Sequence, residues 1–311
     1  MVPTVDCEFN VAGHGAEIFK ALGQYSAVFL KNTGFDWKKY ERLKSTMNKF
    51  WELPVDKKQK VARLPVVKSS GYIGFDVESF KQGNQHEVHE AYNFTLNADY
   101  WNIYPEDDVP GITRAVNQLH LNARGVMGEV LKGFAACQGW DEKWLLDLHG
   151  MLDGDESMPP CGQLRCLNYP VIDDYTVKAD ETAIRFGEHT DYGSLTFSLQ
   201  DLIGGLQIRN RDGVWVSADP PESELMTLIA GDMMELMTNG RIQAAPHRVF
   251  VTEASRQATR QSIIVFVGPQ DNVLLRPLNV VDGNIAKYNP TTFGDHCERR
   301  TRAQFQDKLM Y

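Results

Sequence analysis

Two adjoining stretches decide the fold: Gly-Glu-His-Thr-Asp-Tyr-Gly at residues 187–193 and, directly after it, Ser-Leu-Thr-Phe-Ser-Leu at residues 194–199. In the second stretch, leucine and phenylalanine alternate with serine and threonine. Successive side chains of a β-strand point to opposite faces of the sheet, so this period of two predicts a strand with one buried face and one polar face. A histidine and an aspartate therefore stand directly before a predicted strand.

Five further segments in the second half of the chain have the same short, apolar character. Turn signals separate them, for example Asp212-Gly213 and Asn239-Gly240. Many short strands between such turns favour an antiparallel sandwich or jelly-roll barrel over a parallel sheet of βαβ units. The predicted strands are Gln163–Tyr169, Gly205–Arg209, Met226–Ala230, Arg248–Thr252 and Ser262–Val267.

The first half of the chain is predicted to be mainly helical. Lys38–Leu53 is one candidate helix, and Thr113–Gln138 is another because its apolar residues recur close to every 3.6 positions. Glycines count against the second helix, since each costs up to about 1 kcal/mol relative to alanine; they are Gly125, Gly128 and Gly133. No repeat or linker marks a boundary, and we divide the chain into a mainly helical region, residues 1–155, and a jelly-roll domain with a C-terminal lid, residues 156–311.

The composition of the 311 residues limits the expected partners. Lys and Arg total 32 and Asp and Glu total 41, which gives a net charge of −9, and no basic block is present. Nucleic acid and anionic membrane surfaces are therefore poor partner predictions. The sequence has no basic and apolar leader, no apolar run of about 18 residues and no Cys-x-x-Cys pair, so we expect a soluble, cytoplasmic protein with free thiols.

His189 and Asp191 are candidates for a metal site. In extended backbone, residues i and i+2 point from the same face, so both side chains can reach one ion from a single strand end. His247 is the candidate for a third ligand because it lies just before a predicted strand of the same β region. Two imidazoles and one carboxylate on one side of a divalent ion leave positions open, the arrangement of non-haem Fe(II) enzymes that activate O2.

A His-x-Asp pair alone is weak evidence, because most histidines are structural or solvated and such pairs occur by chance. Arg260-Gln261-Ser262, which begins 13 residues after His247, adds a second feature. The same i, i+2 relation places a guanidinium and a hydroxyl on one face, where they suit a carboxylate. A surface salt bridge is the alternative for this arginine, but the apolar run Ile263–Phe266 favours a buried anion site.

The order of these residues resembles the isopenicillin N synthase-like branch of the 2-oxoglutarate/Fe(II) dioxygenases. The resemblance extends beyond the site, because the family's catalytic-domain pattern is followed nearly continuously at residues 187–196, 204–207 and 231–249. The first half is similar more loosely, at residues 28–35, 53–58, 71–72 and 89–92. Together these segments cover most of the chain.

The resemblance implies an α+β fold with a mainly β core: a double-stranded β-helix (jelly roll, cupin-like) with a helical N-terminal region. It also implies an enzyme that uses Fe(II), O2 and 2-oxoglutarate as cosubstrate. The residues that match the family's iron ligands are His189, Asp191 and His247. Arg260 and Ser262 match the pair that binds the distal carboxylate of 2-oxoglutarate, and Tyr169, directly before Pro170, matches the tyrosine that hydrogen-bonds a carboxylate in the pocket.

One departure from the family pattern concerns the residues before Tyr169. Many plant members have an asparagine two positions earlier, where this chain has Leu167. Asn168 and Arg165 therefore stay open as contacts in the pocket, and flavonoid or hormone oxidation gains no special support.

The resemblance further implies oxidation of a small molecule by hydroxylation, desaturation or ring closure. A secondary metabolite or an amino-acid derivative is the expected substrate, and a monomer is the expected state. Family analogy places substrate contacts on Gly71–Asp76, with Tyr72 as the leading candidate, on Phe266, and on Arg299–Tyr311 as a lid. Tyr192, beside the predicted ligand Asp191, either supports the site or belongs to the core.

Two alternatives stay open. One is an oxidase of the same fold that uses iron without 2-oxoglutarate, because some relatives use the Arg-x-Ser pair to hold a substrate carboxylate or another activator. The other is a non-catalytic jelly roll that binds a small molecule or structural zinc. The intact set of predicted metal ligands and the Arg-x-Ser pair argue against the second alternative.

Overall fold

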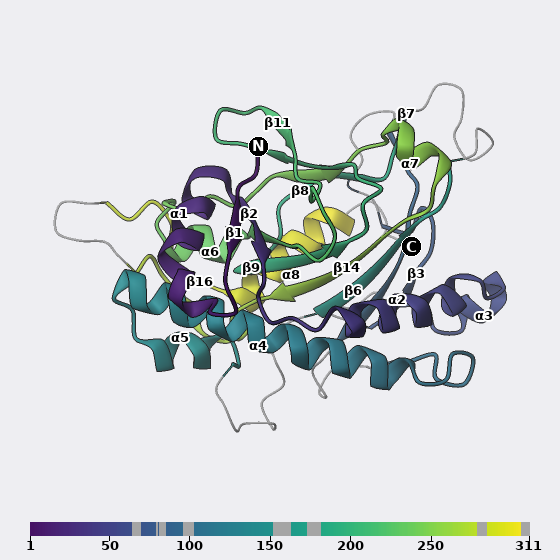
Figure 1. Cartoon of the computed structure of the whole chain (residues 1–311), viewed down its shortest axis with the longest axis horizontal. Helices are drawn as coiled ribbons and strands as arrows, with labels where there is room; N and C mark the ends of the chain where they lie inside the picture. The colour runs from purple at the N-terminus through teal and green to yellow at the C-terminus, as the bar shows by residue number, and fades with distance from the viewer. Residues whose placement is uncertain are drawn as a thin grey trace.

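Two β-sheets face each other in the computed structural model, and helices pack against the outer face of the larger sheet (Figure 1). The structure describes residues 1–63, 70–78, 80, 85–95, 103–151, 163–172, 182–278 and 285–305. The predicted fold class, an α+β jelly roll with a mainly β core and a helical N-terminal region, is confirmed.

The larger sheet has eight strands and takes them from both halves of the chain. β1 pairs with β2 in parallel, and the other described pairs in this sheet are antiparallel. In spatial order its strands are β1 (Thr4–Asp6), β2 (Ala27–Lys31), β12 (Met226–Ala230), β9 (Leu195–Gln200), β14 (Arg260–Val267), β6 (Gln163–Tyr169), β5 (Glu90–Thr95) and β3 (Gly71–Ile73).

The smaller sheet has four strands, all paired antiparallel. In spatial order they are β11 (Trp215–Ser217), β10 (Leu206–Arg209), β13 (His247–Val249) and β8 (Phe186–His189). Two short pairs complete the described sheets: β15 (Leu274–Leu275) with β16 (Thr291–Thr292), and β4 (Gln85–Glu87) with β7 (Thr182–Ile184).

The helices lie mostly in the first half of the chain, where α2 and α4 run along one side of the larger sheet (Figure 1). Helix α2 begins where Asp36 accepts a hydrogen bond from the Lys38 amide, a side-chain cap that satisfies one free backbone donor. The helices are α1 (Gly15–Tyr25), α2 (Trp37–Trp51), α3 (Val55–Gln59), α4 (Ile112–Gln138), α5 (Glu142–Leu148), α6 (Asp232–Met237), α7 (Glu253–Gln257) and α8 (Phe293–Phe305), with a short 3-10 turn at Ala12–His14.

The larger sheet separates two cores. On β14, Ile263 and Val265 pack into the cluster shared with the helices, whereas Ile264 packs against the cluster between the two sheets. Alternation along the strand therefore sends Arg260 and Ser262 inward, toward the smaller sheet. The two polar inward residues of this strand, Arg260 and Ser262, therefore lie between the sheets.

β9 shows the same division and corrects one expectation. All six of its residues are buried, so its polar face is not exposed to solvent. Phe197 faces the helices, but Thr196, Ser198 and Gln200 face the smaller sheet, which covers them. The polar face of this strand therefore lines an interior space, where a site can form.

The other predicted strands agree with the structure to different degrees. β6 and β12 have the predicted bounds, and β10 and β14 differ from the prediction by 1 and 2 residues at one end. The predicted strand Arg248–Thr252 is wrong in its second half, because β13 ends at Val249 and Thr252 caps α7 through a capping box with Ser255.

The first half of the chain contains both predicted helices, as α2 and α4, but it also supplies four strands of the larger sheet. The strand β2 is a short apolar run whose first four residues are all buried, so it shows no alternation that would predict a strand. The division at residues 155/156 stays a prediction.

Two glycines allow α1 to cross α4 at close range. A Cβ atom at Gly133 would lie 2.7 Å from the Gly15 Cα and 2.8 Å from the Ala12 carbonyl oxygen. Gly125, on the same helix, has no heavy atom within 4 Å of such a Cβ. Gly133 is therefore required by the close packing of α1 on α4, whereas Gly125 lies at an uncrowded position of the same helix.

We predict that Gly133→Ala lowers the free energy of unfolding by about 2 kcal/mol, because the new methyl group meets backbone atoms that cannot move aside. The matched control Gly125→Ala should raise it by up to about 1 kcal/mol, the gain in helix propensity at an uncrowded site. Urea unfolding measures both values. Equal effects of the two substitutions would contradict the crossing.

Candidate active site

The three side chains predicted to hold a metal come together between β8 and β13. His189 Nε2 lies 3.8 Å from Asp191 Oδ1, and His247 Nε2 lies 3.9 Å from Asp191 Oδ2. Sheet register causes this arrangement, because His247 pairs directly with His189 across the two strands. The three ligand atoms lie within 4.8 Å of one another, a spacing that one cation can span.

Hydrogen bonds fix which nitrogen each imidazole presents. His189 Nδ1 lies 2.9 Å from the Gly187 carbonyl oxygen, and His247 Nδ1 lies 2.8 Å from that of Ala245. Each carbonyl oxygen accepts the Nδ1 proton, which leaves the Nε2 lone pairs directed toward Asp191. Burial, together with the neighbouring His247, lowers the pKa of His189 well below its usual range, so this ring is neutral and able to bind a metal.

The carboxylate of Asp191 is the group that most needs a cation. Asp191 is buried, and its Oδ2 has no hydrogen-bond partner in the part of the chain that the structure describes. Leaving a buried carboxylate oxygen without a partner is costly. A divalent ion between the two Nε2 atoms and this carboxylate would satisfy all three groups, so the residues fit a ferrous ion with positions left open for other ligands.

A second polar group lies on the inward face of β14 and its neighbours. Arg260 Nη2 donates to Gln200 Oε1 at 2.6 Å, and Arg260 Nη1 lies 3.4 Å from Ser262 Oγ. Tyr169 is the residue opposite Arg260 on β6; its ring lies 4.9 Å from the guanidinium, and its hydroxyl shares a hydrogen bond with Ser262. The structure thus brings the three predicted cosubstrate residues together and adds Gln200.

Arg260 is a buried cation with no ion-pair partner among the described residues. Its side chain is 1% exposed, its Nε has no hydrogen-bond partner, and none of its described neighbours forms an ion pair with it. Burying a charge without a counter-charge costs several kcal/mol. A ligand of opposite charge would offset this cost. A bound carboxylate would supply that charge.

A row of rings connects the two groups. Between ring centroids, the distance from Tyr169 to His89 is 6.0 Å, and the distance from His89 to Phe186 is 4.6 Å. The Phe186 ring in turn lies 4.8 Å from that of His189. Phe80 also stacks on the His189 ring, with 4.8 Å between the centroids, and its ring lies 5.3 Å from that of Phe186. The Arg260 group and the His-Asp-His group therefore lie at the two ends of one row of rings between the sheets. Sequence periodicity could not reveal this row, because its members come from separate segments.

Arg165, which the sequence left open, is an inward residue of β6. It forms a buried ion pair with Glu78, and its Nε has no hydrogen-bond partner. Its guanidinium lies 5.4 Å from the Phe186 ring. Burial alone would raise the pKa of Glu78, but the charge of Arg165 lowers it to about 2. Arg165 therefore belongs to the wall of the space, and no sequence signal pointed to Glu78.

Tyr72 and Asn168 belong to the opposite face of the larger sheet. The Tyr72 hydroxyl donates to Glu90 Oε2 at 2.8 Å, and Asn168 Nδ2 donates to Glu90 Oε1 at 3.0 Å. Lys58 Nζ donates to the same carboxylate at 2.9 Å. The prediction of Tyr72 as a substrate contact is therefore wrong: alternation along β3 turns this ring into the helix-side core. Asn168 is likewise excluded from the pocket.

Two other expected contacts have different outcomes. Phe266 is an inward residue of β14 and is partly exposed, as expected for a wall of an open space. Tyr192 packs beside the helix-side core, below the guanidinium of Arg300 at 4.7 Å. The expected lid at Arg299–Tyr311 lies partly outside the described residues, since residues 306–311 are not described.

Two protein-family models match this chain. Residues 161–269 match the model described as the 2OG-Fe(II) oxygenase superfamily, and residues 2–113 match the model for the N-terminal region of the non-haem dioxygenase in morphine synthesis. The chain belongs to the 2OG-Fe(II) oxygenase superfamily. The family resemblance in the sequence is confirmed.

Known proteins that resemble this 2OG-Fe(II) oxygenase align with it over most of their length. The "2-oxoglutarate-Fe(II) type oxidoreductase ppzD" of Metarhizium rileyi is 27% identical over an alignment of 303 positions, which covers 89% of this chain and 82% of the relative. The "Homoarginine-6-hydroxylase 2-ODD-233" of Oryza sativa is 25% identical, covering 89% of this chain and 85% of the relative. The crystal structure of a full-length Neurospora crassa protein in complex with alpha-KG superimposes with a TM-score of 0.83 at 24% identity, covering 96% of this chain and 95% of that chain.

The protein is therefore an oxidoreductase that uses Fe(II), 2-oxoglutarate and O2. Neither the comparisons nor the charge distribution indicates nucleic acid as a partner. Among the helices in the described ranges, none combines the length and the apolar character that crossing a bilayer requires.

The Arg165–Glu78 pair generates a prediction about stability. We expect Glu78→Gln to lower the free energy of unfolding at pH 7 by about 3 kcal/mol, because it leaves Arg165 buried without its counter-charge. The Glu78 pKa is lowered from 4.5 to about 2 by folding, so the advantage of the wild type is complete above pH 4.5 and declines as the pH falls toward 2.

The matched control for this prediction is Glu298→Gln, which removes the partner of Arg302 in a pair exposed to solvent. It should change stability by less than about 1 kcal/mol. Chemical denaturation between pH 2 and pH 7 measures both variants. A difference between wild type and Glu78→Gln that grows on acidification would contradict the assignment.

Proposed function

We propose that His189, Asp191 and His247 hold the ferrous ion of this oxygenase. The proposal depends on one observation above all: the buried Asp191 Oδ2, which has no hydrogen-bond partner, lies 3.9 Å from an imidazole Nε2 whose own Nδ1 is already bonded. Such a cluster of acceptors is stable only with a cation among them.

We further propose that Arg260, Ser262 and Tyr169 bind the distal carboxylate of 2-oxoglutarate. Arg260 would supply a charge-assisted hydrogen bond, the hydroxyls would complete the grip, and Gln200 would hold the guanidinium in place. When bound, Fe(II) and 2-oxoglutarate supply the oxidising chemistry, in which O2 and 2-oxoglutarate are consumed, succinate and CO2 are released, and the substrate is oxidised.

The remaining wall of the space would receive the substrate. The inward residues Ile264 and Phe266 of β14 are partly exposed. On the neighbouring strand β6, Arg165 Nε has no hydrogen-bond partner among the described residues. These features suit a small organic molecule that is partly apolar and carries a hydrogen-bond acceptor. The names of relatives span homoarginine hydroxylation and leucoanthocyanidin oxidation, so we propose an amino-acid derivative or another secondary metabolite. A cytoplasmic monomer is the proposed state.

The main prediction concerns cosubstrate turnover. Supplied with Fe(II), 2-oxoglutarate and O2, the wild type should release succinate, and His247→Ala should reduce this by at least about 100-fold, more than the 10–100-fold loss that follows removal of a group behind a metal ligand. His14→Ala, a partly exposed histidine near the N-terminus, is the matched control and should retain the wild-type rate.

Oxygen uptake separates this proposal from the oxidase alternative. Uptake that requires 2-oxoglutarate supports the proposal. Uptake at the same rate without 2-oxoglutarate would instead favour an oxidase whose Arg-x-Ser pair holds the substrate. A screen of metabolites for faster succinate release would then identify the substrate class.

Cosubstrate binding yields a further prediction. Arg260→Gln should raise the KM for 2-oxoglutarate by about 10- to 100-fold, because a hydrogen bond to a charged group contributes about 1.5–3 kcal/mol. Arg256→Gln on the exposed side of α7 removes the same charge and should leave KM unchanged. An unchanged KM in the Arg260 variant, with an intact thermal melt, would contradict the assigned role.

A further inference from the structure

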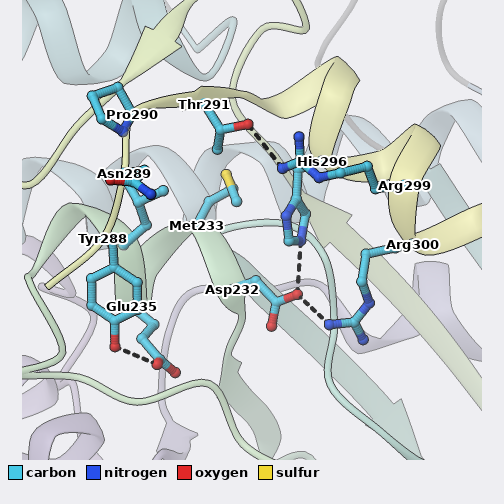
Figure 2. Close-up of a pocket in the computed structure, with 11 residues that line it drawn as sticks. Asp232, Met233, Glu235, Tyr288, Asn289, Pro290, Thr291, His296, Arg299 and Arg300 are labelled. Carbon is cyan, nitrogen blue, oxygen red and sulfur yellow. Dashed lines mark hydrogen bonds and ion pairs between the residues drawn. The ribbon is translucent and has the colours of Figure 1, made fainter.

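Helix α8 is tied to the helix that follows β12 through one carboxylate. Asp232 Oδ2 accepts hydrogen bonds from His296 Nε2 at 2.8 Å and from Arg300 Nη1 at 2.9 Å. Figure 2 shows both side chains of α8 converging on Asp232. The side chains of Asp232 and His296 are 13% and 17% exposed, so these contacts are largely shielded from water.

The same guanidinium reaches the turn between two predicted iron ligands. Arg300 Nη2 donates to the Thr190 carbonyl oxygen at 3.2 Å and lies 3.1 Å from Thr190 Oγ1. Thr190 stands between His189 and Asp191 in the sequence. Arg300 therefore connects Asp232 on one side to the ligand turn on the other.

The carboxylate that holds Arg300 is itself fixed against the turn. The Asp232 amide donates to the Asp191 carbonyl oxygen at 2.9 Å, and the Met233 amide donates to that of Gly193 at 2.9 Å. Gly231 permits this approach, because a Cβ atom there would lie 2.4 Å from the Gly193 carbonyl oxygen. The start of α6 and the ligand turn are thus hydrogen-bonded to each other. Arg300 bonds to both, through Asp232 and Thr190.

We propose that Arg300, held by Asp232 and His296, is a positioning residue that sets the orientation of the ligand turn and thereby the affinity for the metal. This inference rests on the proposed function, since it assumes that His189 and Asp191 bind the ion. Arg300 would act through Thr190, which its guanidinium contacts at both the carbonyl and the hydroxyl oxygen. Residues behind metal ligands commonly change metal affinity 10- to 100-fold.

The sign of the effect distinguishes positioning from simple electrostatics. Arg300 is a cation near a site for a divalent cation, so its charge alone opposes metal binding. Removal of that charge should therefore tighten binding if Arg300 acts only through its field. A positioning role requires the opposite result, because the turn loses its support and the ligands lose their alignment.

The adjacent Arg299 is a matched control for the charge. It donates to Thr291 Oγ1 at 3.0 Å, and Figure 2 shows it directed away from Asp232. Both arginines border a cavity of about 500 Å³ between α6, α8 and residues 288–291. Arg299→Gln removes the same charge from the same helix without releasing Thr190.

The experiment titrates the metal-free full chain with Co(II), which replaces Fe(II) without oxidation by air, and follows the visible absorption of the bound ion. We expect Arg300→Gln to weaken Co(II) binding by about 10-fold, and Arg299→Gln to change it by less than about 2-fold. Arg300→Lys, which keeps the charge and loses the forked geometry, should restore part of the affinity.

A second variant keeps the test independent of folding. Thr190→Val removes one acceptor of Arg300 and no charge, and it should weaken Co(II) binding in the same direction by a smaller factor. Thermal melting of each metal-free variant separates loss of fold from loss of affinity. Unchanged or tighter binding in folded Arg300→Gln, or equal weakening in Arg299→Gln, would overturn the inference.

Failure of the proposed function gives a different result. If Co(II) binds equally well to the wild type and to His247→Ala, the ion is not at the predicted ligands and the proposed function fails. If His247→Ala abolishes binding while Arg300→Gln does not weaken it, only the positioning role fails.

Discussion

The register between β8 and β13 is the constraint on which the rest of the site depends. His247 pairs with His189 across these two strands, and this pairing, together with the two-residue step to Asp191, brings two imidazoles and a carboxylate to one point. A shift of the register by one residue would turn one histidine to the opposite face of the sheet. The smaller sheet therefore has to be held in a single alignment, and the larger sheet with its helix layer provides the rigid support against which it packs.

The interior carries groups that a folded chain ordinarily avoids. Asp191 and Arg260 are both buried, and each has a side-chain atom without a hydrogen-bond partner. Groups of this kind lower stability unless a ligand completes them, and a protein retains them where function requires it. A large helix-side core, from α1, α2 and α4 to the apolar face of the larger sheet, offsets that cost. The fold thus separates two tasks: one face of the large sheet packs into the helix-side core, and the other carries the residues proposed to bind the cosubstrate, opposite the smaller sheet with the proposed iron ligands.

Much of this arrangement could be predicted from sequence, because it follows from local periodicity. Short apolar segments between turn signals predicted β6 and β12 with their observed bounds, and the i, i+2 relation placed Arg260 and Ser262 on one face. The errors have physical causes. Tyr72 lies on a strand of three residues, too short for its face to be read, and it points into the helix-side core. Gln200, Glu78 and Arg300 reach the site only through pairing of segments far apart in the chain, which one sequence does not encode in any local pattern.

The central claim is that three side chains share one ion, and anomalous X-ray diffraction from crystals of the metal-loaded protein tests it most directly. The account predicts a single strong peak at about 2.0–2.2 Å from the Nε2 atoms of His189 and His247 and from a carboxylate oxygen of Asp191. A peak elsewhere in the chain, or one that contacts fewer than these three residues, would contradict it.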